Sequence, residues 1–244
     1  QMCYPNGGVV DDLLIYRYDA KRYFLVVNAS NAQKDYEWLA GHAAGNVTVT
    51  DASAEFAELA LQGPKAEAVL QRLTHFDLSS IPFFHFADGV EISGLVAIVS
   101  RTGYTGEDGF EIFVPWDRGP KLWDAILEAG KEEGVRPIGL GARDSLRFEA
   151  CLPLYGHELG IDPEGREIPL FSSPLAAFAV SFSSLKGDFT GREALLKQQA
   201  AYRRILARDY SLRADLPRMT RAVALTGRGV ARAGSTVSKD GRPV

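Results

Sequence analysis

The sequence has 244 residues, of which 24% are charged and 46% hydrophobic, and its formal net charge is −4. These values are typical of a globular protein with a sizeable core, in one large or two medium domains, and they do not favour a nucleic acid or a membrane surface as partner. No apolar run approaches the roughly 20 residues of a membrane span. Cys3 and Cys151 lack metal-type spacing and are typical of reduced thiols in the cytoplasm.

The first predicted element is a β-hairpin. Residues 7–18 and 23–28 form two runs rich in apolar, β-branched and aromatic residues, joined by a short charged corner. The pair Asp11 and Asp12 is unusual at the mouth of such a hairpin, because a dehydrated carboxylate needs a partner or a proton. One of the two is therefore a candidate functional residue. The alternative is a turn carboxylate that accepts local N–H groups.

The length of the hairpin loop decides which aspartate faces Asn28. A two-residue loop places Asp11 on the face of Asn28, whereas a three-residue loop over 19–21 pairs Asp12 with Asn28 directly. Pattern alone leaves both loops open, and we favour the longer one. The shared face then carries a carboxylate and an amide above an apolar floor, which suits a flat ligand with a polar edge. The residues on this face are Asp12, Tyr16, Phe24, Val26 and Asn28.

Helices and strands are mixed in the part of the chain after the hairpin. Amphipathic spacing and helix-start signals predict four helices, and β-branched runs predict four strands. The helices are expected at 33–43 with Asn31 as its cap, 64–73, 121–132 and 142–150, and the strands at 47–51, 55–61, 91–100 and 110–114. No regular βαβ repeat links them, so the order indicates the α+β class.

The last third of the chain changes in character. Residues 154–174 are rich in Gly and Pro and are predicted to form a long surface loop, followed by a short helix that ends near residue 199. Beyond residue 202 arginines are dense and strands are predicted at 221–226 and 234–238. We therefore expect an α+β region at 1–200 and the start of a β-rich domain at 201–244.

Both ends of the chain suggest that it is a piece of a longer protein. The N-terminal residues lead directly into a predicted strand, without an initiator methionine. Near the C-terminus, Asp240 and Gly241 form a turn signal of the kind that joins two strands. The second of these strands has no room to finish, so we expect the protein to continue beyond Val244.

Two further segments carry groups suited to binding. Glu111 alternates with large apolar neighbours in a predicted strand, so its carboxylate points to solvent or into a polar pocket. In a pocket, it can accept two parallel N–H bonds from the edge of a pterin or a guanine. Arg143 begins a predicted helix, where an anion would suit it better than the helix dipole does. The alternative is an exposed ion-pair network among the charged residues of 143–149.

Six segments of the sequence closely resemble the aminomethyltransferase (T-protein) family of the glycine cleavage system, in the family's order and spacing. They are 7–13, 26–29, 61–64, 101–111, 139–150 and 189–195. The resemblance implies a multi-domain, cloverleaf-like α+β fold around a central tetrahydrofolate site, with a C-terminal β-barrel that is truncated here. It also implies transfer of an aminomethyl carbon to tetrahydrofolate from the dihydrolipoyl arm of a carrier, the H-protein, with release of ammonia.

The resemblance also implies roles for single residues. Asp12 corresponds to the essential acidic residue, and Asn28 and Glu111 correspond to contacts with the pterin. Tyr104 and Arg143 are similar to further folate-site residues. Residues that resemble the lining of the pocket are Met2, Tyr16 and Val26.

Three alternatives share parts of this pattern. A folate-binding iron–sulfur-assembly relative carries the motif K-G-C-Y-x-G-Q-E, but residues 186–193 here read KGDFTGRE, without the cysteine. Folate-dependent demethylases, and the folate domains of enzymes that oxidise dimethylglycine or sarcosine, share the scaffold. A non-catalytic folate-binding module is the third alternative.

Overall fold

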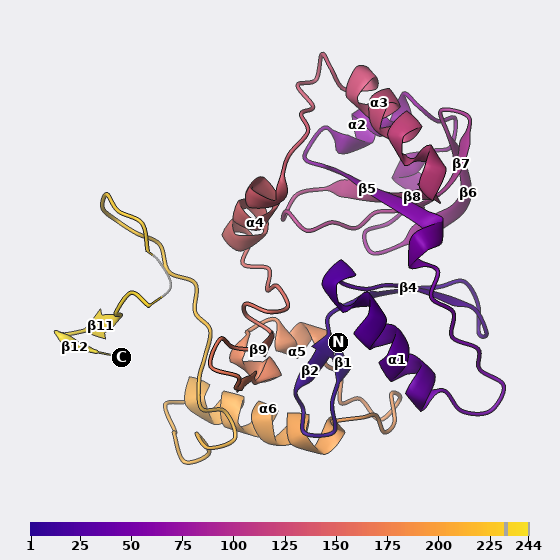
Figure 1. Ribbon diagram of the computed structural model, residues 1–244. Helices are drawn as coiled ribbons and strands as arrows, with labels where there is room; N and C mark the ends of the chain where they lie inside the picture. The colour runs from indigo at the N-terminus through magenta and orange to yellow at the C-terminus, as the bar shows by residue number, and fades with distance from the viewer. Residues whose placement is uncertain (232–233, 244) are drawn as a thin grey trace.

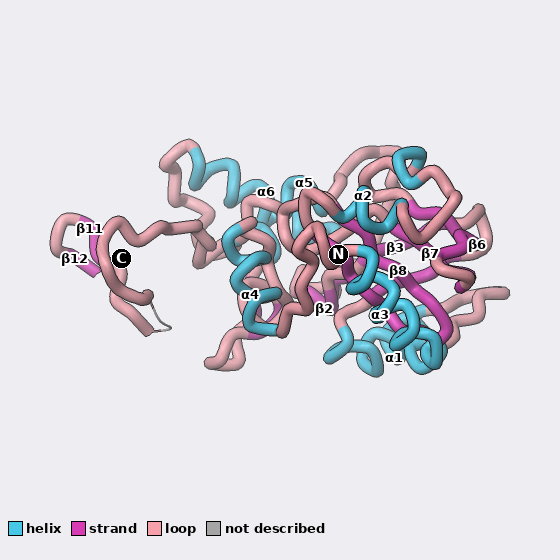
Figure 2. Tube along the Cα trace, turned by 90° about the horizontal axis from the view of Figure 1, so that it is seen from above, coloured by secondary structure: helices cyan, strands magenta, loops and turns pink. Residues whose placement is uncertain are grey.

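The computed structural model describes residues 1–231 and 234–243. Figure 1 shows one part of the molecule built on a four-stranded sheet with two helices, and a second part that contains both the N-terminal strands and the long C-terminal helix. The last two strands lie away from both parts in the two views (Figures 1 and 2). Within the described residues, no helix is long and apolar enough to cross a membrane.

The four-stranded sheet is antiparallel, with the order β5-β8-β7-β6. Its strands are β5 (Phe56–Gln62), β6 (Phe86–Ile92), β7 (Leu95–Ser100) and β8 (Gly109–Pro115). Helices α2 (Ala66–Gln71) and α3 (Gly119–Ala129) pack on one face and bury Phe110, Ile112 and Val114 of β8. Since side chains alternate along a strand, Glu111 and Phe113 point to the opposite face.

A β-hairpin covers this opposite face. Strands β3 (Leu14–Arg17) and β4 (Tyr23–Val26) pair in the register that places Tyr16 opposite Phe24. Tyr18 N donates to Arg22 O at 3.0 Å and closes a loop over 19–21, which confirms the predicted three-residue loop. The Tyr16 ring is buried against the sheet, where it stacks on Phe86 with the ring centres 5.0 Å apart.

The first strand of the hairpin is shorter than predicted. Residues 7–18 do not form one strand: β2 (Val9–Asp11) pairs with β1 (Met2–Cys3), and β3 begins only at Leu14. The chain therefore passes from one two-stranded sheet to another at Asp12 and Leu13. The two adjacent aspartates lie at this junction, so their backbones and surroundings differ.

A second core lies around the C-terminal helix. It includes β9 (Gly160–Ile161), β10 (Glu167–Ile168), α5 (Ala176–Ala179) and α6 (Arg192–Leu206). The prediction of a surface loop at 154–174 is wrong, because Leu159, Leu170 and Phe171 are almost fully buried in this core. Helix α6 is longer than predicted and continues through residue 200, and Leu216 is buried in the same core.

Several other predicted elements are confirmed with shifted ends, and a few are wrong. Helices α1 (Ala32–His42) and α4 (Leu140–Glu149) form close to where they were predicted. Residues 47–51 and 221–226 form no strand, and the strand predicted at 91–100 is instead the β6–β7 hairpin. Asp240 and Gly241 turn with φ of 53° and 75° between β11 (Ser238–Lys239) and β12 (Arg242–Pro243), as predicted, whereas the strand predicted at 234–238 is limited to Ser238.

Candidate functional site

Asp11 is the buried centre of a polar cluster at the junction of the two N-terminal sheets. Its Oδ2 accepts from the backbone N of Asn28 at 3.0 Å, and its Oδ1 accepts from Asn28 Nδ2 at 2.9 Å. Asn31 Nδ2 donates to the same Oδ1 at 2.6 Å. Asn31 occupies the N-cap position of α1, as predicted, but its side chain makes no capping bond, because its amide donates to Asp11.

Asp12 lies beside this cluster and is partly exposed. Its Oδ1 accepts from Asn28 Nδ2 at 3.0 Å, and its backbone O accepts from the same amide at 3.1 Å. Burial, followed by the charge of Asp11, raises the pKa of Asp12. Both aspartates therefore contact Asn28, but Asp11 is enclosed and Asp12 is the one that a ligand can reach.

Glu111 lies on the face of the sheet that the hairpin covers. Its Oε2 accepts from Thr102 Oγ1, and Thr102 Oγ1 also lies 3.3 Å from the Tyr16 hydroxyl and 2.8 Å from Ser100 Oγ. Burial is the main cause of the raised pKa of Glu111, and the Thr102 hydrogen bond and Arg143 oppose it. A chain of hydroxyl groups thus connects the hairpin to Glu111.

Tyr104 and Arg143 form a stacked pair. The Arg143 guanidinium lies 4.7 Å from the centre of the Tyr104 ring, and the Tyr104 hydroxyl donates to Pro153 O. Burial raises the pKa of Tyr104 to about 12, and the charge of Asp12 adds to this effect. Arg143 lowers the pKa of Glu111. The pair therefore lies within electrostatic reach of both Asp12 and Glu111.

The ion pairs of helix α4 belong to Arg147 instead of Arg143. Arg147 is buried, and it donates to Asp144 Oδ1 at 2.8 Å and to Glu158 Oε2 at 2.6 Å. It also donates to Leu152 O at 3.1 Å. The predicted alternative of an exposed network through Arg143 is therefore wrong, and the Arg143 side chain is left to stack on Tyr104.

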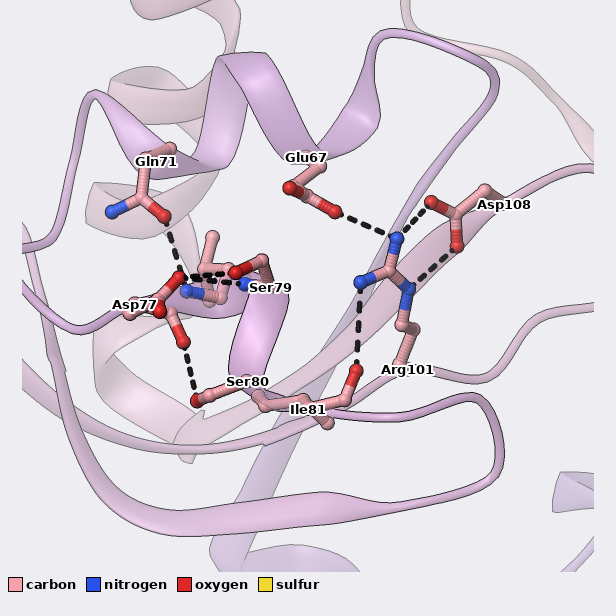
Figure 3. A network of polar contacts seen from close by, with 9 residues as sticks. Glu67, Gln71, Asp77, Ser79, Ser80, Ile81, Arg101 and Asp108 are labelled. Atoms are coloured by element: carbon pink, nitrogen blue, oxygen red, sulfur yellow. Dashed lines mark hydrogen bonds and ion pairs between the residues drawn. The ribbon is translucent and has the colours of Figure 1, made fainter.

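Arg101 holds the base of the loop that carries Thr102 and Tyr104 (Figure 3). Its guanidinium makes a two-pronged pair with Asp108 at the other end of the loop, with Nε 2.9 Å from Oδ1. It also reaches Glu67 of α2 at 2.6 Å and Ile81 O at 3.4 Å. This network fixes both ends of the loop to the sheet and to α2.

The glycines of the same loop allow close packing. Gln62 Nε2 donates to Thr102 O at 3.1 Å and to Phe110 O at 3.2 Å. A Cβ at Gly103 or Gly109 would lie 1.9 Å or 2.3 Å from Gln62 Oε1, so neither position accepts a side chain without moving this amide. Gly103 and Gly109 therefore allow this part of the loop to pack against Gln62.

The residues predicted to line the folate pocket lie in two different parts of the structure. Tyr16 and Val26 belong to the apolar cluster between the hairpin and the sheet. Met2 pairs with Asp11 in the β1–β2 ladder and lines a cavity of about 230 Å³ together with Trp38 and Phe189. No other predicted site residue lines this cavity, so Met2 adjoins the aspartate cluster through Asp11 while its cavity lies apart from the other predicted residues.

Two acidic groups near the site were not predicted. Glu58 of β5 shares the sheet face of Glu111, because Ala60 pairs with Glu111 and Glu58 lies two residues before it. Burial of its carboxyl and the nearby Glu111 raise the pKa of Glu58 to about 7. Asp35 of α1 is buried. Two sequence signals could have indicated these residues. Glu58 lies in the strand predicted at 55–61, where side chains alternate between faces, and Asp35 lies four residues after Asn31 on the same side of the helix.

Comparisons with known proteins agree with the α+β fold. The family described as the GCVT N-terminal domain matches residues 1–170, and the chain belongs to this family. An aminomethyltransferase of Caldanaerobacter subterraneus subsp. tengcongensis is 55% identical over 199 residues, which cover 81% of this chain and 51% of that protein. An aminomethyltransferase of Geobacillus kaustophilus is 49% identical over 243 residues, or 100% of this chain and 61% of that protein.

A solved structure is also similar. It is the glycine cleavage system aminomethyltransferase T from Bartonella henselae, with a TM-score of 0.64 and 31% identity, and the match covers 81% of this chain and 51% of that one. The chain therefore spans about half the length of most of the proteins it matches here.

Proposed function

We propose that this chain forms the folate-binding part of an aminomethyltransferase of the glycine cleavage system. Its family and its named relatives support this function. The structural observation that carries it is the Tyr104–Arg143 pair, which lies within electrostatic reach of both Asp12 and Glu111. These four side chains come from distant parts of the sequence, so their convergence supports one shared site.

The donor and acceptor groups suit tetrahydrofolate. The pterin ring has an edge of parallel N–H donors, which a carboxylate such as Glu111 can accept. Thr102 occupies only one of the lone pairs of Glu111 Oε2, and its hydrogen bond orients the carboxylate. Asn28 donates its amide to both aspartates, so its own carbonyl oxygen is available to a ligand donor.

Asp12 is the proposed catalytic acid-base group. A thioether that carries an aminomethyl group expels its thiolate as the nitrogen develops iminium character, and a nearby carboxylate stabilises this cation. The same carboxylate can accept the proton of the folate nitrogen that attacks the carbon. The raised pKa of Asp12 makes its ionised form a better proton acceptor.

The proposal for the whole protein includes partners and architecture. The donor substrate is the aminomethylated dihydrolipoyl arm of a carrier, the H-protein. The architecture is a cloverleaf-like arrangement around the folate, with the division at 1–200 and 201–244 and a C-terminal barrel, in the cytoplasm. Because α6 crosses residue 200, the second domain would start after this helix. The relatives are aminomethyltransferases, which does not favour the demethylase or flavoenzyme alternatives.

The substitution Asp12→Asn tests the assignment. We expect the variant to bind tetrahydrofolate within about threefold of the unchanged protein, and to lose about 100-fold or more in kcat, since general acid–base and electrostatic contributions are of that size. The measurement is ammonia release from the aminomethylated lipoyl carrier with tetrahydrofolate, together with calorimetric titration of tetrahydrofolate. Asp124→Asn, on the exposed side of α3, is the matched control. Weakened binding with unchanged kcat would contradict the role.

A further inference from the structure

Asp35 is a buried carboxyl group without an assigned role. It lies in the first turn of α1 and is only 1% exposed. Neither of its oxygens meets a hydrogen-bond donor among the residues that the structure describes. A buried ionised carboxylate in this state is strongly disfavoured, because burial removes its water and supplies nothing in return.

The neighbour of Asp35 is the Asp11 carboxyl, which lies within hydrogen-bonding reach. Two ionised carboxylates only accept hydrogen bonds, so they cannot bind each other. The nearby cation is Lys34, but its Nζ donates to Val10 O at 2.5 Å and lies 4.0 Å from the centre of the Tyr155 ring. Among the described residues, Lys34 makes no hydrogen bond to either oxygen of Asp35.

A single proton resolves this arrangement. Asp11 already accepts three N–H bonds from Asn28 and Asn31, which favour its ionised form. If Asp35 carries the proton, its O–H becomes a donor to Asp11, and the buried Asp35 carboxyl no longer carries a charge. We propose that Asp35 is a positioning residue, whose protonated carboxyl holds Asp11 and through it fixes Asn28 and Asp12 in the site. The inference rests on the proposed function only in its link to turnover.

The electrostatics of the cluster agree with this arrangement. Burial raises the pKa of Asp35 most, followed by its hydrogen bond to Asp11 and the Asp11 charge. Asp12 raises it further, and Lys34 opposes the shift. Ionisation of Asp35 at high pH would place a second charge against Asp11. The Asn28 amide bridges Asp11 and Asp12, so displacement of Asp11 would disturb Asp12 as well.

The first test measures the proton without any ligand. A group with a raised pKa in the folded state stabilises the protein below its unfolded pKa, and this stability is lost as the pH rises through the folded pKa. The free energy of unfolding in urea should therefore fall from about pH 5 to about pH 9 in the unchanged protein, relative to Asp35→Asn. Glu37→Gln, on the exposed side of the same helix, should follow the unchanged protein. Parallel curves for Asp35→Asn and the unchanged protein would overturn the proposal.

The second test measures positioning. Asp35→Asn keeps a donor toward Asp11, so we expect kcat near the unchanged value and a smaller loss of activity at alkaline pH. Asp35→Ala removes the donor, and we expect kcat to fall about tenfold or more, because small displacements of a reacting group are costly. An unchanged alkaline limb in Asp35→Asn would overturn the role, as would full kcat in Asp35→Ala. If Asp35→Ala does not fold, the pH profile of Asp35→Asn decides.

The two tests also separate this inference from the proposed function. Absence of folate-dependent turnover in the unchanged protein would contradict the proposed function. The pH dependence of unfolding would still decide whether Asp35 holds a proton, since that measurement uses neither folate nor carrier.

Discussion

The neighbouring aspartates differ because the chain changes sheets between them. Asp11 ends strand β2, where three N–H groups reach its carboxylate, and it is completely buried. Asp12 lies outside any strand and shares only the Asn28 amide. Asp11 therefore organises the cluster, whereas the Asp12 carboxylate stays partly exposed. The sequence pattern could not separate them, because the break between the strands depends on contacts with β1.

Glu58 provides a prediction for pH dependence. Its pKa is raised to about 7, so the protonated form is favoured in the folded state, and the stability this gives is lost as the pH rises from the unfolded value through about 7. The residue as a whole is exposed although the surroundings of its carboxyl are crowded, so water screens the interaction and we expect a small effect. Urea unfolding at pH values below and above this range should show a larger decline in the unchanged protein than in Glu58→Gln. An equal decline would show that Glu58 is not protonated near neutral pH.

At the scale of elements, the loop over 101–109 and helix α4 meet at Gly106. This glycine has φ of 77°, and a Cβ on it would lie 2.7 Å from Ala150 Cβ at the end of α4. The loop and the helix carry Tyr104 and Arg143, so their contact sets the distance between these two side chains. The sequence shows the glycine but not its neighbour, because Ala150 is brought to it only by the tertiary fold.

Gly106→Ala should destabilise the protein by about 1–3 kcal/mol from the left-handed backbone alone, and by more from the contact with Ala150. Gly134→Ala is a matched control, since Gly134 has φ of 81° and open space around it. Chemical unfolding of both variants measures the difference. Equal losses would show that the loop and α4 are not in close contact.

Arg147 anchors α4, and its replacement tests this. Arg147→Met leaves the Glu158 carboxylate without its cation in a partly buried place, and we expect a loss of about 3 kcal/mol in unfolding free energy. Arg143→Met, on the exposed surface of the same helix, should cost little stability but weaken tetrahydrofolate binding. If the two variants are equally unstable, α4 is not held by Arg147.

At the scale of the whole molecule, the turns and helices that depend on local sequence were predicted correctly. The loop over 19–21, the turn at Asp240 and the helices beginning near residues 32 and 140 all formed. The segment 154–174 was misread, because its Gly and Pro content indicates a loop while its apolar side chains are buried against α6. Burial of this kind follows from long-range packing, which composition does not show.

The candidate site was likewise predicted only in part from the sequence. The resemblance implied that Asp12, Asn28, Tyr104, Glu111 and Arg143 share one site. In the structure, Asn28 contacts Asp12 and Arg143 stacks on Tyr104, while the charge of Asp12 acts on Tyr104 and that of Arg143 acts on Glu111. Asp35 and Thr102 were missed, since their roles depend on which groups face them across elements. The site thus combines residues that a motif reveals with supporting residues that only the fold reveals.

A crystal structure of the protein with bound tetrahydrofolate tests the central claim most directly. The account predicts that the pterin edge lies within hydrogen-bonding distance of the Glu111 carboxylate, and that the reacting part of the folate lies beside Asp12. Folate bound with its pterin away from Glu111, or with Asp12 on a surface that the ligand does not reach, would contradict it.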